Sequence, residues 1–131
     1  DLLYGDQGGD IVVGNLGADT LFGGDGDDRM HGGQENDVLD GGAGADFVTG
    51  DRGADTVHGG AGADTFHFFD GAGVDRVMDF NYGEGDRVNL APGSARTVYQ
   101  GGEGVVIDLY DGDQMLLVGV NLSTLPSDWI G

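Results

Sequence analysis

The sequence predicts an all-β fold of short, stacked strands, and three observations carry that prediction. Residues 5–67 repeat with a period of nine residues, without insertion or deletion. The first half of each repeat is rich in glycine, which is typical of a tight turn. The second half alternates between mixed and apolar residues, which is typical of a short strand with one buried face. Repeats this short bury their apolar side chains only by stacking on their neighbours.

The glycine-rich half has a regular composition when positions are counted from Gly5. Position one is glycine in all seven copies, and position four is glycine in every copy except the one that carries Glu35. Position two is glycine in four copies and Asp6, Asn15 or Asp51 in the others. Asp and Asn are the non-glycine residues that best tolerate a left-handed backbone. The first half of each repeat is therefore predicted to be a turn.

The second half carries two invariant features, an acidic residue at position six and an apolar residue at position eight. The acidic residues are Asp1, Asp10, Asp19, Asp28, Asp37, Asp46, Asp55 and Asp64. The apolar residues are Leu3, Val12, Leu21, Met30, Leu39, Val48, Val57 and Phe66. We expect a three-residue strand at positions seven to nine, with position eight facing the core.

The repeat matches the pattern G-G-x-G-x-D-x-U-x, where U is apolar. On these residues the chain resembles the C-terminal part of RTX (repeats-in-toxin, hemolysin-type) proteins, whose nonapeptides bind calcium. The resemblance implies a parallel β-roll with two repeats per turn and calcium in the turns. It also implies a module that folds on binding extracellular calcium and supports the type I secretion and folding of an attached protein. The parent would then be a secreted, extracellular protein with a catalytic or adhesive domain upstream.

The column of aspartates gives a physical reason for a metal. If two repeats make one turn, position-six carboxylates recur every 18 residues along each edge, about 4.8 Å apart. Two such columns of like charge require cations between successive carboxylates. Calcium takes about six to eight oxygen ligands, and glycine-rich turns can direct backbone carbonyls at it.

The resemblance also implies a ligand set for each ion. One turn supplies the carbonyls of positions two and four and the position-six Asp, and the turn 18 residues later supplies the carbonyls of positions one and three and its own Asp. The complete sites are Asp6, Gly8, Asp10, Gly23, Asp25 and Asp28; Asn15, Gly17, Asp19, Gly32, Gln34 and Asp37; Gly24, Gly26, Asp28, Gly41, Ala43 and Asp46; Gly33, Glu35, Asp37, Gly50, Arg52 and Asp55; and Gly42, Gly44, Asp46, Gly59, Ala61 and Asp64.

The run DRVMDF and the following Asp86 resemble the closing segment of family rolls. That resemblance implies a last site made by Gly60, Gly62, Asp64, Asp79 and Asp86. Asp75 is expected to face Asp55 in a similar way, despite a two-residue insertion. The Glu35 side chain is expected to face solvent, so that only its carbonyl serves the ion.

Charge restricts the partners. The chain has 24 acidic residues, five arginines and no lysine, and its formal net charge is −19. Nucleic acid and anionic membrane are therefore poor partners. About five to seven calcium ions would leave a net charge of about −9 to −5. The bare chain resembles a disordered polyanion, so we expect its folding to depend on calcium.

The period breaks at residue 68. We expect residues 1–67 to form the roll, and residues 68–131 to hold a degraded repeat, an antiparallel β cap and a possible C-terminal secretion signal. Residues 104–120 predict a hairpin with a turn at Tyr110–Asp113, which would cover the last rung. The tail, which ends in Trp129 and Ile130, resembles the C-terminal ends of type I secretion substrates; packing of these residues on the cap is the alternative.

Other chemistry is not supported. A phosphate-binding P-loop needs a lysine, and the EF-hand frame is missing. The three histidines fall at position nine, where His31 and His67 would share a sheet about 9.6 Å apart and His58 would lie on the opposite sheet. They are interpreted as surface residues and not as a zinc site.

No acid, base or nucleophile breaks the repeat, so we expect a non-catalytic module. No signal peptide and no apolar run of about 18 residues is seen, so no membrane insertion is expected. The alternative function is a calcium-stiffened surface-adhesion or S-layer element. Many further repeats upstream would favour that alternative, whereas a compact catalytic domain upstream would favour the secretion module.

Overall fold

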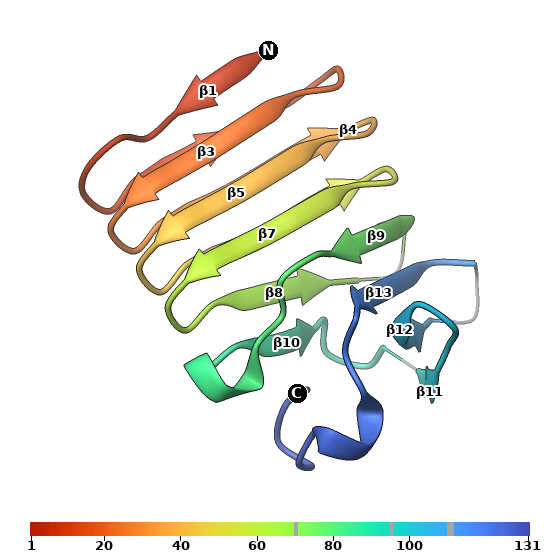
Figure 1. The fold of residues 1–131 in the computed structure, drawn as a ribbon. Coiled ribbons are helices and arrows are strands. Elements are labelled where there is room, and N and C mark those ends of the chain that lie inside the picture. The colour runs from red at the N-terminus through yellow and green to blue at the C-terminus, as the bar shows by residue number, and fades with distance from the viewer. Residues whose placement is uncertain (70, 95, 110–111) are drawn as a thin grey trace.

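The computed structural model describes residues 1–69, 71–94, 96–109 and 112–131, and its fold is all-β, as predicted. The strands wind into a flattened solenoid with two facing sheets (Figure 1). Sheet A contains β1 (Leu2–Tyr4), β3 (Thr20–Asp25), β5 (Val38–Ala43), β7 (Thr56–Ala61), β9 (Val74–Val77), β13 (Gln114–Val118), β12 (Gly104–Asp108) and β11 (Thr97–Gln100), in that spatial order. Sheet B contains β10 (Arg87–Leu90), β8 (Thr65–Phe68), β6 (Phe47–Arg52), β4 (Arg29–Gln34) and β2 (Ile11–Val13). Two 3₁₀ segments, η1 (Tyr82–Glu84) and η2 (Leu122–Thr124), follow β9 and β13.

The strand register confirms that two repeats make one turn. In sheet A, Leu21 pairs with Leu39 in the parallel register, and in sheet B, Val48 pairs with Phe66. Strands β3 to β7 are six residues long, not three as expected. Identical turns also stack in register, so the ladder continues through them; for example, the Asp25 N–H donates to the Asp6 carbonyl at 2.8 Å.

The turns have the left-handed backbone that position two indicated. Asp6, Asn15 and Asp51 have φ angles of 75°, 73° and 68°. Glu35, at position four, also has a positive φ of 81°. The sequence identified Glu35 only as the exception to glycine at position four, and its left-handed backbone was not predicted.

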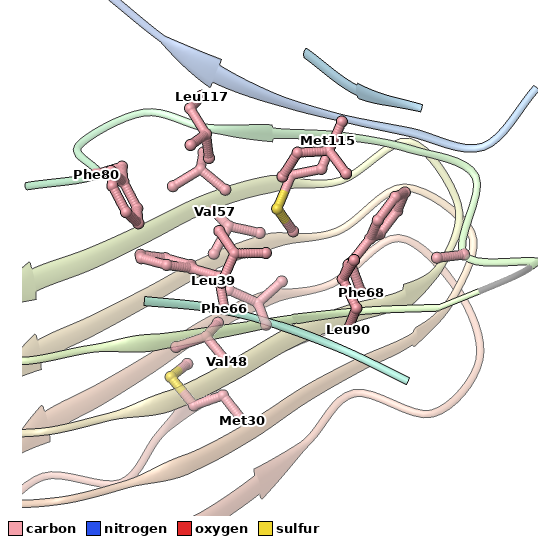
Figure 2. Close-up of a cluster of buried hydrophobic side chains, with 14 of the residues drawn as sticks. Met30, Leu39, Val48, Val57, Phe66, Phe68, Phe80, Leu90, Met115 and Leu117 are labelled. Atoms are coloured by element: carbon pink, nitrogen blue, oxygen red, sulfur yellow. The ribbon is translucent and has the colours of Figure 1, made fainter. Parts of the chain in front are cut away.

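The core is a single column of inward side chains between the two sheets (Figure 2). Position eight supplies one buried residue per repeat, as predicted: Val12, Leu21, Met30, Leu39, Val48, Val57 and Phe66. The column continues without a break into the C-terminal part, where Phe68, Leu90, Met115 and Leu117 join it. Residue 67 thus marks the end of the repeat and not the end of the core.

The C-terminal part closes the roll in a way that the sequence predicted only partly. The β12–β13 hairpin forms, and β13 pairs in parallel with β9, so it covers the free edge of sheet A. An additional strand, β11, pairs antiparallel with β12 and was not predicted. Of the predicted hairpin turn, Tyr110 and Asp111 lie outside the described residues, as does Asp70 in the degraded repeat.

The tail covers the last strand of sheet B. Val88 of β10 forms a parallel bridge with Ile130, and the Val88 N–H donates to the Trp129 carbonyl at 2.9 Å. Trp129 is buried, so the alternative that the tail residues pack is confirmed, with β10 as a neighbour. Its role as a secretion signal stays a prediction. Within the described ranges, no helix has the length and apolar character needed to cross a membrane.

Candidate metal centres

Position-six aspartates form two hydrogen-bonded columns along the two edges of the roll. The backbone N–H of each Asp donates to Oδ1 of the Asp one turn later, which fixes every carboxylate against the preceding turn. The donor–acceptor pairs are Asp10–Asp28, Asp28–Asp46, Asp46–Asp64 and Asp64–Asp86 on one edge and Asp19–Asp37, Asp37–Asp55 and Asp55–Asp75 on the other, at 2.8 to 3.2 Å. The predicted facing of Asp55 and Asp75 is confirmed.

The second oxygen of each repeat carboxylate is unsatisfied. Among the described residues, Oδ2 is buried without a hydrogen-bond partner in Asp10, Asp19, Asp28, Asp37, Asp46, Asp55 and Asp64. A buried carboxylate oxygen without a partner costs several kcal/mol of desolvation. Such oxygens are the ligands that hard divalent cations prefer. The unpartnered oxygens therefore indicate cation sites within the columns.

Position-one glycines leave the space that such ions would need. A Cβ added at Gly23 would lie 2.5 Å from Oδ2 of Asp28 and 2.5 Å from the carbonyl oxygen of Gly41. At Gly5, the corresponding distances are 3.0 Å to Oδ2 of Asp10 and 2.5 Å to the carbonyl of Gly23. An unsatisfied carboxylate oxygen and a carbonyl of the next turn thus face the same point. Both oxygen types belong to the ligand set that the family resemblance implies.

The structure stacks the remaining predicted ligand residues in consecutive turns. The Asn15 carbonyl accepts from the Gln34 N–H at 2.8 Å, so one of its lone pairs is already used. Glu35 is exposed, as predicted. The stacked pairs of turn residues include Gly24 and Gly42, Asp25 and Ala43, Gln34 and Arg52, Gly42 and Gly60, and Ala43 and Ala61.

Asp79 and Asp86, the two cap residues of the predicted closing site, accept hydrogen bonds from the backbone. Both oxygens of Asp79 accept hydrogen bonds, from the N–H groups of Gly59 and Gly60, at 2.9 Å. Asp86 accepts from the Asp64 N–H at 2.9 Å, in the manner of the repeat aspartates. Asp79 and Asp86 therefore lie beside the last turn of the roll.

The columns are electrostatically unfavourable at neutral pH. Burial raises the pKa of Asp55 and of Asp64 to about 6. Burial, followed by the charge of Asp55, raises the pKa of Asp75 to about 8. Burial also raises the pKa values of Asp37, Asp46 and Asp86. At neutral pH these buried carboxylates therefore need either a nearby cation or protonation.

Side chains alone do not form a metal site. No group of three His, Cys, Asp or Glu side chains is close enough to hold an ion in the part of the chain that the structure describes. An ion in the columns would thus take most of its ligands from backbone carbonyls. His31 in β4 and His67 in β8 are separated by β6, and His58 lies in sheet A, so the predicted separation of the histidines is confirmed.

Two position-five residues that the sequence did not single out also join successive turns. Oδ1 of Asp27 accepts from the Ala45 N–H at 2.8 Å, and Oδ1 of Asn36 accepts from the Ala54 N–H at 2.9 Å. Both pairs are 18 residues apart, so the period could have identified them.

A protein-family model matches the region that contains most of the two aspartate columns. The family model of the RTX calcium-binding nonapeptide repeat, which has four copies, matches residues 4–39, 31–66 and 40–77. These matches together cover more than half of the chain. No curated protein matches the chain.

Two similar solved structures come from bacterial proteins. One is a subunit of the mannuronan C5-epimerase from Azotobacter vinelandii, with 25% identity, a TM-score of 0.49, and coverage of 96% of this chain and 78% of that one. The other is an extracellular lipase from Serratia marcescens, with 16% identity, a TM-score of 0.53 and coverage of 94% of this chain. At this identity the similarity to the lipase shows a shared fold. The chain spans 38% of the length of the lipase.

Proposed function

The chain belongs to the RTX calcium-binding nonapeptide repeat family, and from this premise we propose that it folds on binding extracellular calcium and supports the type I secretion and folding of an attached protein. The observation that carries the proposal is the set of buried Oδ2 atoms without partners, one in each complete repeat. An apo roll would bury these oxygens at high cost, whereas a calcium ion would satisfy them.

The proposed ions lie between successive turns, with the ligand sets that the family resemblance implies. Each interior Asp, such as Asp28 or Asp46, would contribute to two sites in the same column. The glycine turns would supply carbonyls, as at Gly23 and Gly41, and calcium would supply the positive charge that the columns lack. The expected number is about five to seven ions, which matches the number of paired turns and the closing segment.

Coupled binding and folding would make the module fold only after export. The sites do not exist in the unfolded chain, so the free energy of binding calcium is free energy of folding. In low calcium the chain would stay an extended polyanion that can be exported, and outside the cell it would fold. We propose no catalytic step within these residues; a hydrolase or another activity would belong to the attached domain.

A metal titration tests the calcium proposal. Metal-free protein should gain β-sheet circular dichroism cooperatively as calcium is added, with about five to seven ions bound by calorimetry. Magnesium is the matched control, because its demand for a small octahedral shell suits these carbonyl-rich turns poorly. A complete β-sheet spectrum in excess chelator would overturn the proposal.

The secretion proposal is tested separately. A reporter fused upstream of the chain should be exported by a type I machinery. Scrambling residues 122–131 should abolish export if the tail is the signal, while calcium-dependent folding is measured in parallel. Export of the scrambled fusion at the parent level would place the signal elsewhere.

A further inference from the structure

The outer face of sheet B carries a groove that the calcium proposal does not use. Its volume is about 530 Å³, and it lies over the ends of β2, β4 and β6, on the solvent side of the sheet. Residues that line it include Leu16, His31, Gln34, Asp51, Arg52 and Phe69. Gln34 and Arg52 would give calcium only their carbonyls, so their side chains remain available to the groove.

The groove is a gap in the row of position-two side chains. Along sheet B this row reads Asn15, Gly33 and Asp51, with Gly33 beside Asp51 in the register. Asn15 and Asp51 therefore stand about 9.6 Å apart with no side chain between them. In sheet A the same row begins with Asp6 and continues with Gly24, Gly42 and Gly60. No second side chain therefore stands opposite Asp6 to form a groove there.

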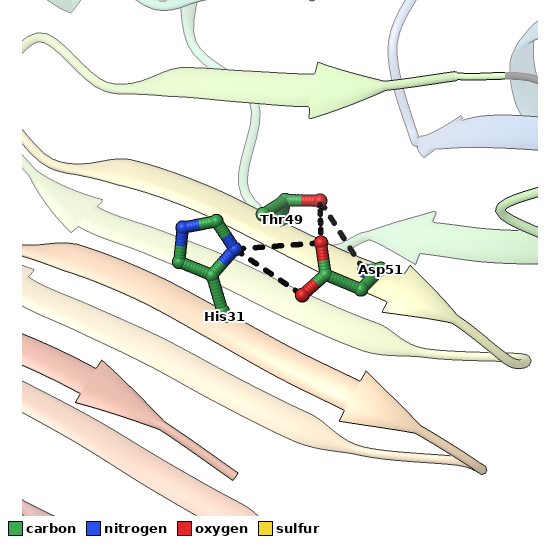
Figure 3. Close-up of polar contacts among 3 residues, drawn as sticks. All are labelled: His31, Thr49 and Asp51. Atoms are coloured by element: carbon green, nitrogen blue, oxygen red, sulfur yellow. Dashed lines mark hydrogen bonds and ion pairs between the residues drawn. The ribbon is translucent and has the colours of Figure 1, made fainter. Parts of the chain in front are cut away.

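A fixed polar network forms one side of the groove (Figure 3). Nδ1 of His31 lies 3.2 and 3.4 Å from the two carboxylate oxygens of Asp51. The Thr49 hydroxyl donates to Oδ1 of Asp51 at 3.2 Å, and Thr49 is only 2% exposed. These contacts hold the Asp51 carboxylate and the imidazole ring in place before any ligand arrives.

The groups in the groove are mixed in kind and balanced in charge. Arg52 offers only donors, Asp51 only acceptors, and the amides of Asn15 and Gln34 offer both. The formal charges of Arg52 and Asp51 cancel, although the whole chain carries −19. Apolar surface comes from Val13, Leu16 and Phe69. A neutral ligand with adjacent hydroxyl groups and an apolar face would satisfy all of these groups.

An aromatic row extends the surface beyond the groove. Ring centroids of Phe47 and His67 are 5.6 Å apart, and those of His67 and Phe69 are 5.9 Å apart, with the rings stacked in both pairs. The Arg29 guanidinium lies 4.5 Å from the centre of the Phe47 ring. Because these rings stack on one another and Arg29 covers the Phe47 ring, the row offers ring edges and a guanidinium donor to a sugar chain that leaves the groove.

We propose that this groove, with the row of rings beside it, binds a neutral glycan chain. Sugar hydroxyls would pair with His31, Asp51 and Arg52, and a C–H face of a sugar would pack on Phe69. Anionic polymers are disfavoured, because Asp51 and the net charge of the chain would repel them.

Calcium-loaded, ¹⁵N-labelled protein provides the test. The probes are cellohexaose, xylohexaose and mannohexaose, with polygalacturonate as the anionic comparison. At least one neutral hexasaccharide should shift the amide resonances of Gly33 and Arg52, while Gly60 in sheet A stays unchanged. The variants His31→Ala and Asp51→Asn should weaken binding by about tenfold each, because each removes a fixed hydrogen-bonding group.

His58→Ala is the matched control, since it changes position nine on the opposite sheet and should leave binding unchanged. Position nine carries Val13, Phe22 and Asp40 in other copies, so the fold tolerates a change at His31. Asn tolerates the positive φ of Asp51. The β-sheet spectrum of each calcium-loaded variant separates a loss of folding from a loss of glycan binding. Binding of none of the neutral probes, binding of polygalacturonate alone, or unchanged affinity in both groove variants would overturn the proposal.

Discussion

Carboxylates in the repeat turns and carboxylates in the C-terminal cap, residues 68–131, are stabilised in different ways. A repeat aspartate such as Asp46 accepts one backbone hydrogen bond through Oδ1 and leaves Oδ2 buried and unpartnered. In the cap, Asp79 uses both oxygens, and Asp113 accepts from the N–H groups of Gly71 and Gly73 at 2.6 and 2.9 Å. The repeat carboxylates therefore leave oxygens for an added cation, whereas backbone N–H groups satisfy both oxygens of Asp79 and of Asp113. Asp75 is the exception in the cap, because burial raises its pKa to about 8.

The repeats and the cap also differ in how many apolar side chains they bury. Each repeat buries one side chain at position eight, whereas the cap packs a denser cluster against the end of the roll. Phe80 links the two regions, because its ring centroid is 6.1 Å from that of Phe66 and 6.1 Å from that of Trp129. The cap thus closes the end of the roll with apolar contacts.

The largest effect is expected for Asp46→Ala, which tests the dependence of the repeats on shared ions. On the proposed ligand sets, Asp46 serves two sites, and its Oδ1 also accepts from the Asp28 N–H at 2.8 Å. Calorimetry should show two fewer bound ions, together with a loss of about 1–3 kcal/mol for the unpaired N–H. Asp40→Ala, at position nine of the preceding repeat, is the control and should keep the full ion count. An unchanged count in Asp46→Ala would argue against sharing between turns.

Leu117→Ala tests how much the apolar contacts between the cap and the roll stabilise the fold. Leu117 is fully buried and pairs with Val77 at the junction of cap and roll. The truncation should lower the free energy of unfolding in saturating calcium by about 2–5 kcal/mol, and it should leave the ion count unchanged. Leu116→Ala, on the opposite and half-buried face of β13, should cost less when both are measured by urea unfolding. Equal costs would mean that the cap contributes little through its core.

Acid should partly replace calcium in the two aspartate columns. Burial raises the folded-state pKa of Asp75 to about 8 and of Asp64 to about 6, from an ordinary value of 3.8. Between pH 4 and 8 the folded roll therefore binds more protons than the unfolded chain, so the stability of the metal-free roll falls as pH rises through this window. Metal-free protein should show more β-sheet circular dichroism near pH 4 than at pH 8.

Asp75→Asn gives this experiment its control. The amide keeps an acceptor for the Asp55 N–H but does not ionise, so it imitates the protonated acid. Its metal-free β-sheet signal should depend less on pH between 6 and 8 than that of the parent. Equal pH dependence in the two proteins would assign the effect to the net charge of the chain instead.

The repeats were predictable because repetition imposes one conformation on many residues. The inward position eight follows from the period, and the two-repeat turn, which makes the aspartates face one another, was implied by the family resemblance. Leu21 opposite Leu39 confirms that turn. The cap was less predictable because its contacts join unlike segments. Asp113 accepts hydrogen bonds from Gly71 and Gly73, about 40 residues earlier, and no local pattern indicates that pairing.

The groove was also hidden from the sequence, for a related reason. It depends on which side chains interrupt the repeat in neighbouring turns of one sheet, and His31 meets Asp51 only after the roll has formed. The ligand sets of the metal centres lie between these cases. The period brings their residues together, while the occupancy of each site depends on ions that a sequence does not contain.

The smallest effect is expected for Glu35→Gly, and it tests whether an irregular repeat weakens the roll. Glu35 has a φ of 81° at a position that is glycine in the other copies. A non-glycine residue in this conformation costs about 1 kcal/mol. Glycine removes that cost but raises the conformational entropy of the unfolded chain, which offsets part of the gain. The variant should therefore gain about 0.5 kcal/mol in calcium-saturated urea unfolding with an unchanged ion count, because only the carbonyl is a proposed ligand. Glu35→Asn should give a smaller gain, since Asn tolerates the left-handed region. A loss of an ion or of stability in Glu35→Gly would instead give the Glu35 carboxylate a role in the roll.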